Sequence, residues 1–366
     1  MMRGDSLGIP PVTCHHMQLR IWIMAKKWIY RFDELRSSHN DLVGKKCANL
    51  GEMTHLGMQV PPGFAIAVGG YEYFMKETGA ETEIKQYVQK NSGELSHVEM
   101  QIEAGRYIRS VIESKGVPYQ IRDELQKTYE GLCEQVGVEN LPVAVRSSGA
   151  VSMPGQMETY LNVAGKKEVV TKVIKVWASA FTTRAIAFRI EKNMALHRAP
   201  IGVAVLKMVN AKSAGVTLTV QPTTGDLSKI VVEGNWGLGE SVVSGDITPD
   251  NFIIDKNTEE IRSTISKKPK MVTFKDKGTH VVEVPQELQE KSCLERYELE
   301  EIVRIALKVE AHYDMPQDME WVFDKDLPFP DNLFWVQTRP AKYVKEQKKM
   351  SNTDYIADLM TRVFNR

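Results

Sequence analysis

One stretch in the middle of the chain combines an arginine with small hydroxyl and glycine residues. The apolar run from Leu141 to Val145 predicts a strand, which leads directly into Arg146 and a loop that ends near Thr159. Backbone N–H groups of such a loop can point at an anion, and a guanidinium can place two donors on a phosphate. Small residues such as Gly155 let the backbone approach a polyphosphate closely. By itself the stretch favours phosphate binding and an ordinary surface loop about equally.

Two further glycine-containing loops predict ligand contacts. Gly44–Cys47 precedes a predicted helix, so Lys45 or Lys46 can place an ammonium on a phosphate beside the helix N-terminus. Adjacent lysines are more often merely solvated charges, so this signal is weak alone. Glu233 ends a predicted strand and is followed by the glycine-rich run 234–240, where missing side chains would allow close approach to a ligand. A plain turn is the alternative for this second loop.

Four polar residues near the C-terminal end of the chain predict a metal and phosphate site. Asp318 and Glu320 alternate along one predicted strand, and Gln337 and Arg339 alternate along the next. If the two strands pair, carboxylate and amide oxygens meet a guanidinium, and this combination suits a complex of Mg²⁺ with a polyphosphate. An isolated Glu–Arg pair on a surface would contribute less than ~1 kcal/mol and would need no ligand. Taken together, the two glycine-containing loops and these two strands favour a metal and phosphate site over an isolated surface pair.

The elements that would position these residues predict a mixed α/β (α+β) fold. Turn residues divide 28–66 into strand, loop, helix and strand, and helical spacing of apolar residues follows over 70–136 and 169–191. The later part of the chain predicts strands at 203–206, 215–220 and 230–232, a hairpin over 252–261, a helix at 298–312, and a strand pair at 319–323 and 333–337.

Composition excludes several classes of protein. The chain has 366 residues, with 47 basic and 47 acidic side chains that cancel, so no overall field attracts a nucleic acid. No apolar run is long enough to span a membrane. The four cysteines are widely spaced and predict free thiols in a reducing cytoplasm. Residues 1–23 lack periodicity and are interpreted as a non-native or disordered leader before a start at Met24.

The order of these motifs identifies a family resemblance. From about Trp28 to Pro340 the chain resembles the N-terminal nucleotide-binding portion of phosphoenolpyruvate synthase and pyruvate, phosphate dikinase. The matching segments are 42–53, 60–64, 146–159, 215–226, 236–250, 312–321 and 337–340. The resemblance implies an ATP-grasp fold whose two lobes close on Mg·ATP, with Mn²⁺ as a possible substitute metal. We expect an N-terminal lobe at 24–200 with a helical insertion, a C-terminal lobe at 201–341, and a basic linker with an amphipathic tail helix at 342–366.

The resemblance also implies roles for individual residues. Lys46 and Arg146 match the phosphate-binding lysine and arginine, and Arg339 matches the arginine that holds the terminal phosphate. These three are the expected catalytic residues. Nucleotide contacts are further expected from Gly155, Glu233, Asp318, Glu320 and Gln337, with Glu320 and Gln337 as metal ligands. The chain departs from the family at Gly44-Lys45-Lys46-Cys47, where Gly-Gly-Lys-Gly is usual, so Lys45 is an alternative to Lys46. It departs again at Leu206, where glutamine is frequent.

Full-length relatives continue into a domain with a phosphorylatable histidine, and none of the eight histidines here lies in such a setting. We therefore expect a separate subunit to supply the histidine and the acceptor site. This arrangement resembles phenylphosphate synthase of anaerobic phenol degradation, in which phenol, ATP and water give phenylphosphate, AMP and phosphate. The alternatives are the ATP-binding subunit of a split phosphoenolpyruvate synthase or other phosphotransferase, and a non-catalytic nucleotide sensor.

Overall fold

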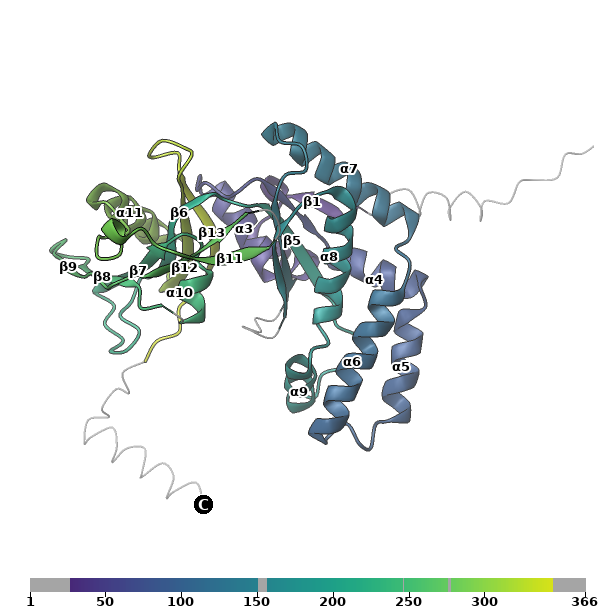
Figure 1. Ribbon diagram of the computed structural model, residues 1–366. Helices are drawn as coiled ribbons and strands as arrows, with labels where there is room; N and C mark the ends of the chain where they lie inside the picture. The colour runs from purple at the N-terminus through teal and green to yellow at the C-terminus, as the bar shows by residue number, and fades with distance from the viewer. Residues whose placement is uncertain (1–26, 151–156, 246, 276–277, 345–366) are drawn as a thin grey trace, which may run out of the picture.

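Two β-sheets with flanking helices form two lobes that lie side by side (Figure 1). The computed structural model describes residues 27–150, 157–245, 247–275 and 278–344. The predicted leader 1–23, Cys14, Gly155 and the predicted tail helix beyond residue 344 lie outside the described residues. Cys47, Cys133 and Cys293 are free thiols, as predicted. Within the described ranges, no helix is both long and apolar enough to cross a bilayer.

The first lobe is built on a five-stranded antiparallel sheet with strand order β1-β2-β5-β3-β4. Because side chains alternate along a strand, Val145 and Val205 enter one core while Ala204 faces a second core on the opposite side. The strands are β1 (Ile29–Arg31), β2 (Gly63–Ile66), β3 (Val143–Gly149), β4 (Thr159–Val163) and β5 (Ile201–Lys207).

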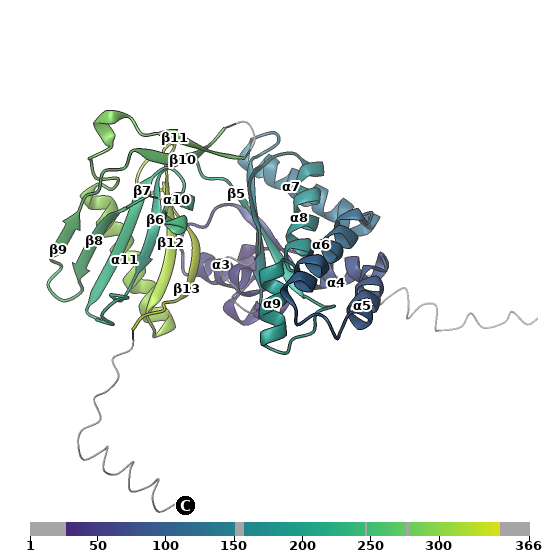
Figure 2. The same ribbon diagram turned by 60° about the horizontal axis from the view of Figure 1, so that its bottom comes forward.

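Helices cover one face of this sheet (Figure 2). They are α4 (Val68–Glu77), α5 (Ala80–Lys90), α6 (Val98–Ser114), α7 (Tyr119–Val136), α8 (Lys166–Ser179) and α9 (Thr183–Glu191). The sequence predicts one helical segment over 169–191, whereas the structure divides it into α8 and α9. The break follows from Thr182, whose hydroxyl caps α9 by accepting the N–H of Ala185 at 3.2 Å.

The second lobe has a six-stranded antiparallel sheet with strand order β13-β12-β6-β7-β8-β9. Its central strands pack against α11 (Arg296–Tyr313) through a shared apolar core. The predicted C-terminal helix, strand pair and hairpin are all confirmed. The remaining elements are β6 (Ala211–Leu218), β7 (Lys229–Trp236), α10 (Glu240–Ser244), β8 (Asp250–Asp255), β9 (Ile261–Thr264), β10 (Lys270–Phe274), β11 (Thr279–Glu283), β12 (Gln317–Asp324), β13 (Leu333–Pro340) and the 3₁₀ turn η3 (Gln286–Leu288).

Sheet membership corrects the predicted boundary between the lobes. Strand β5 pairs with β2 and β3 of the first sheet, so the first lobe extends past residue 200 to Lys207. The neighbouring strand β6 pairs with β7 and β12 of the second sheet. Both strands are short apolar runs, and such runs do not encode which sheet they join.

Helix α3 (Lys45–His55) links the two lobes. It is preceded by η1 (Phe32–Glu34), η2 (Ser37–His39) and α2 (Asn40–Val43). Its apolar residues share one core with Ala204 of the first sheet and Trp335 of the second. The amide of Asn49 donates to the carbonyl of Thr338 at 2.7 Å, so α3 is fastened to β13 as well as to its own lobe.

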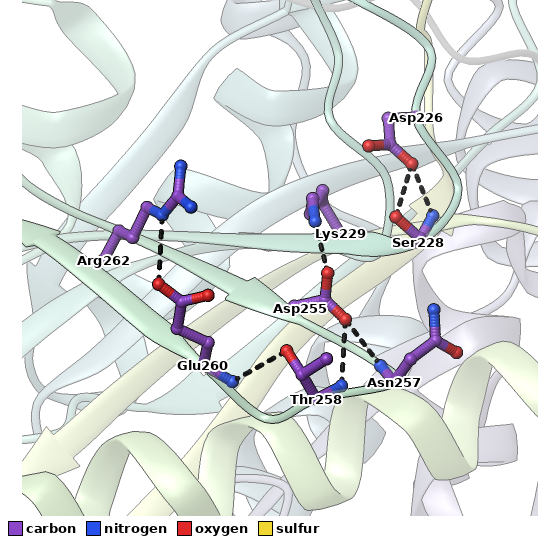
Figure 3. A network of polar contacts seen from close by, with 8 residues as sticks. All are labelled: Asp226, Ser228, Lys229, Asp255, Asn257, Thr258, Glu260 and Arg262. Carbon is purple, nitrogen blue, oxygen red and sulfur yellow. Dashed lines mark hydrogen bonds and ion pairs between the residues drawn. The ribbon is translucent and has the colours of Figure 1, made fainter.

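The far edge of the second sheet carries a polar network that stabilises turns (Figure 3). Asp255 accepts the backbone N–H groups of Asn257 at 2.8 Å and Thr258 at 3.0 Å, and it pairs with Lys229 on β7. These contacts lower the pKa of Asp255 well below its usual range, with the Lys229 hydrogen bond as the largest cause. The network closes the β8–β9 hairpin and lies on a different part of the molecule from the predicted site.

A buried ion pair fastens the loops at one end of the second sheet. Asp250 is fully buried and accepts from Lys268 Nζ at 2.6 Å. The same carboxylate accepts the N–H groups of Ser266 at 3.0 Å and Cys293 at 2.8 Å. Its hydrogen bonds thus hold together three chain segments that are distant in sequence, which is a structural role.

We predict that Lys268→Met destabilises the protein strongly. Removal of the ammonium leaves the Asp250 charge buried and unpaired, which costs about 3–5 kcal/mol. The neighbouring Lys267, whose side chain is 65 % exposed, is the matched control, and Lys267→Met is expected to change stability by less than about 0.5 kcal/mol. Urea unfolding followed by tryptophan fluorescence measures both, and equal losses in the two variants would contradict the structural role.

Candidate nucleotide site between the lobes

Arg146 reaches from the first lobe to the second. It lies on β3 opposite Ala204, on the face of the sheet that points away from the helical layer. Its Nη2 lies 3.4 Å from Oε2 of Glu320 on β12, and both side chains are about four-fifths buried, with 19 % and 18 % exposed. Among the described residues its Nε is buried without a hydrogen-bond partner. The guanidinium therefore retains donor capacity for a ligand.

The start of α3 lies directly beside β3. Gly44 adopts φ +77°, and a Cβ at this position would lie 1.8 Å from the carbonyl oxygen of Ser148. The Ser148 hydroxyl accepts the N–H of Cys47 at 3.0 Å. Only glycine fits at such a close approach, so Gly44 fixes the first turn of α3 against the strand that bears Arg146. The thiol of Cys47 packs into the core rather than into the loop.

The ammonium of Lys46 interacts electrostatically with Arg146 and Arg339 and forms with them a cationic cluster. Burial lowers the pKa of Lys46 to about 8, and the positive charge of Arg146 adds to the effect, with a smaller contribution from Arg339. The carboxylate of Glu320 opposes the shift. A lysine with this pKa gains charge when an anion approaches, because the anion stabilises its protonated form.

Strands β12 and β13 bring the four C-terminal candidates together in two cross-strand pairs. Glu320 lies opposite Gln337, whose Nε2 donates to Oε1 of Glu320 at 2.9 Å. Asp318 lies opposite Arg339, whose Nε and Nη2 contact the same Asp318 oxygen at 2.8 and 2.7 Å. Burial raises the pKa of Asp318, with a smaller contribution from Glu320, and Arg339 opposes the shift. The expected convergence of these strands is therefore present.

A cleft of about 610 Å³ separates the two lobes at this point. Its volume is within the range of small-molecule sites, roughly 300–1,000 Å³. One group of lining residues is apolar: Ala144, Leu206, Met208, Val209, Val322 and Val336. Arg146 and Glu320 supply charge, together with polar residues Thr159 and Glu240. An apolar wall beside charged groups suits a ligand with a flat ring and an anionic end.

Glu233 is not brought into the cleft. It lies in the same sheet row as Glu320, since both residues pair with Val216 of β6, but its Oε1 accepts from the amide of Asn251 at 3.0 Å. Of the predicted site residues that the structure describes, only Arg146 and Glu320 line the cleft itself. Lys46, Asp318 and Gln337 interact with one or both of these two, and Arg339 pairs with Asp318, whereas Glu233 does neither. The expected nucleotide contact of Glu233 therefore stays a prediction, as does that of Gly155, which lies outside the described residues.

The structure adds lining residues that the sequence did not single out. Glu240 is the last residue of the glycine-rich run 234–240, so the sequence motif could have predicted that it lies near a ligand. Gly278 and Thr279 reach the cleft from the β10–β11 hairpin, and no local pattern marks them as ligand contacts. His312 of α11 lies 3.0 Å from the carboxylate of Glu52 on α3.

This architecture, with two lobes and charged side chains at their interface, defines a mixed α/β protein whose cleft suits an anionic ligand. Residues 40–358 match the family described as pyruvate phosphate dikinase, AMP/ATP-binding domain. The match covers most of the chain, so the protein belongs to this family.

Similar curated proteins include the probable phosphoenolpyruvate synthase of Methanocaldococcus jannaschii, 38 % identical over 89 % of this chain and 27 % of that protein. The phosphoenolpyruvate synthase of Pyrococcus furiosus is 33 % identical over 92 % of this chain and 46 % of its own length. That of Aeropyrum pernix is 37 % identical, with 89 % and 44 % covered. The chain thus spans less than half the length of these relatives.

A search of solved structures finds D-alanyl-alanine synthetase A of Vibrio cholerae. The identity is 11 %, with 71 % of this chain and 72 % of that chain covered, and the TM-score is 0.24. This similarity is too low to support any inference about function.

We predict that Lys46, whose charge interacts with that of Arg146, is an unusually reactive lysine. With a pKa of about 8, its amine loses its proton well below the ordinary value of 10.5. Lys127 is the control, because its ion pair with Asp123 raises its pKa. Competitive labelling with acetic anhydride over a pH series, read by mass spectrometry, should give Lys46 a midpoint near pH 8. A midpoint at or above that of Lys127 would refute the lowered pKa.

Proposed function

We propose that the cleft binds ATP, with its base against the apolar wall and its phosphates at Arg146, Lys46 and Arg339. The observation that supports this most directly is the approach of Arg146 to Glu320 across the lobes, with Lys46 electrostatically coupled to both. In the absence of a ligand the guanidinium groups pair with Glu320 and Asp318. A polyphosphate would replace these carboxylates as the partner of the cations.

Glu320 and Gln337 are the residues that would hold Mg²⁺, or Mn²⁺ in its place. A carboxylate and an amide oxygen are hard donors of the kind that Mg²⁺ accepts, and phosphate oxygens and water complete its shell. Glu320 and Gln337 lie opposite each other on paired strands, and the Gln337 amide, whose Nε2 donates to Oε1 of Glu320 at 2.9 Å, would turn over so that its oxygen faces the metal. Asp318 provides a further carboxylate on the same strand face. The metal supplies charge neutralisation between phosphate groups.

The residues of this chain would orient the triphosphate and neutralise charge on the transferred group. Lys46, Arg146 and Arg339 would supply most of the positive charge that neutralises the phosphates. Closure of the lobes would exclude water that competes for the phosphoryl group. No side chain here needs to act as the nucleophile. The β-phosphoryl group would pass to a histidine on a further domain or a separate subunit, so that ATP and water yield AMP and phosphate.

The acceptor that we propose first is pyruvate. Its support is the description of the similar curated proteins as phosphoenolpyruvate synthases, at up to 38 % identity. Phenol, expected from the resemblance to phenylphosphate synthase, is the second candidate, and a nucleotide sensor without transfer is the third. These candidates share the cleft and differ in what receives the phosphoryl group.

An acceptor assay distinguishes the three candidates. The full chain, combined with the gene product that supplies the histidine domain, is incubated with Mg·ATP and either pyruvate or phenol. Formation of AMP with phosphoenolpyruvate is the expected result. AMP with phenylphosphate would instead identify phenol as the acceptor, and Mg·ATP binding without any transfer would identify a sensor. Calorimetry that shows no Mg·ATP binding to the chain, alone and with its partner, would reject all three.

We predict that Glu320→Gln lowers Mg²⁺-dependent phosphoryl transfer roughly 100-fold or more, because a neutral amide is a weaker metal ligand than a carboxylate. The free energy of unfolding should fall as well, by at most about 3 kcal/mol, because the largely buried Arg146 loses its charged partner while the amide oxygen of the new side chain can still accept a hydrogen bond. Glu300→Gln on the exposed face of α11 is the control and should retain full activity. Full activity of Glu320→Gln would contradict the metal assignment.

A further inference from the structure

A two-stranded arm extends from the second lobe across to the first. Strands β10 and β11 pair in register from Lys270 opposite Glu283 to Phe274 opposite Thr279. In both views the arm points away from the six-stranded sheet and toward the strands of the first lobe (Figures 1 and 2). Its outer strand is largely solvent-exposed, and Val281 is 66 % exposed. An isolated two-stranded ribbon has little stability of its own, so this arm depends on its anchor points.

The base of the arm is fixed to the second lobe. Val272 forms a β-bridge with Gly237, and its carbonyl accepts the N–H of Leu238 at 2.8 Å. A Cβ on Gly237 would lie 2.3 Å from the Val272 oxygen, so the arm and this loop are in close backbone contact. The arm therefore moves with the glycine-rich loop that precedes Glu240.

The end of the arm contacts the first lobe. The amide of Asn162 on β4 donates to the carbonyl of Gly278 at 3.0 Å. The hydroxyl of the next residue, Thr279, donates to Glu240 at 3.1 Å. Gly278 and Thr279 line the cleft together with residues 159–161 of β4. The contact between Asn162 and Gly278 thus closes the cleft along this side.

Asn162 adopts a conformation that is unusual inside a strand. Its φ is 55°, in the left-handed region, and the residue is only 7 % exposed. Asparagine tolerates this region better than most residues, and non-glycine residues held there occur often at functional sites. The surrounding structure retains Asn162 in this conformation while its amide contacts the arm.

The opposite side of the cleft is joined more extensively. There α3 binds the second lobe through Asn49 and Thr338 at 2.7 Å and through the apolar core that both lobes share. The backbone of Trp335 also donates to the carbonyl of Gln59 at 2.8 Å. A strongly joined side and a lightly joined side are the arrangement of a hinge opposite an opening.

We propose that Asn162 and the β10–β11 arm form a clasp that opens to admit the nucleotide and closes to retain it. The proposal rests on the proposed function, because the clasp acts on whatever fills the cleft. Asn162 is a positioning residue that holds the arm. Its hydrogen bond favours the closed form, so it slows departure of the nucleotide and also limits entry, which occurs in the open form.

Asn162→Gly tests the clasp, because glycine keeps the left-handed backbone and removes only the amide. Asn193→Gly is the matched control. Asn193 has φ 51°, is exposed and is not among the residues that line the cleft. Stopped-flow measurement with a fluorescent, non-hydrolysable Mg·ATP analogue should show roughly five-fold faster dissociation from Asn162→Gly, and association at least as fast as that of the wild-type protein. Hydrogen exchange without nucleotide should be faster in β11 and β4 of this variant, and unchanged in β12.

The outcomes separate the clasp from the function on which it rests. If wild-type protein binds the nucleotide but Asn162→Gly matches Asn193→Gly in both dissociation and exchange, the clasp is wrong and the proposed function stands. If the exchange of β11 rises but nucleotide dissociation does not, the arm is a structural tie and the clasp is again wrong. If wild-type protein binds no nucleotide, the proposed function fails and the clasp fails with it.

Discussion

The contact between Gly44 and the backbone of Ser148 determines the geometry of the whole cleft. It places the first turn of α3 against β3, so that Lys46 and Arg146 from different parts of the chain lie in one electrostatic cluster. The rest of α3 then packs into the core that both lobes share. One close backbone approach, possible only without a Cβ, therefore sets both the cationic cluster and the attachment of the lobes.

The charged side chains at the cleft are arranged so that most of the cations have a partner within the protein. Arg146 and Arg339 are each paired with a carboxylate of β12, while burial lowers the pKa of Lys46. Each cation has a partner or a reduced charge, which limits the penalty for burial. A triphosphate and a divalent cation would exchange these pairs for stronger ones, so binding and closure of the lobes would be coupled.

Most of the site residues were predictable because strand alternation and register are local properties. Asp318, Glu320, Gln337 and Arg339 follow from two strands that pair with each other, and the structure pairs them as expected. Glu233 shows where such reasoning stops, since it shares a sheet row with Glu320 but its carboxylate accepts from the amide of Asn251 on the neighbouring strand. Alternation along a strand predicts on which side of the sheet a residue lies. The residues that it contacts there depend on which strands become adjacent.

The sequence by itself determined the mixed α/β class, the helices and strands, the family and the residue types suited to phosphate and metal, because periodicity and motif order are properties of the chain. Only the tertiary structure decided that β5 joins the first sheet, that Asp250 is a buried anchor for Lys268, and that Asn162 meets the β10–β11 arm. Each of these depends on contacts between segments far apart in sequence. Such contacts are fixed by packing of the whole chain, and no local pattern records them.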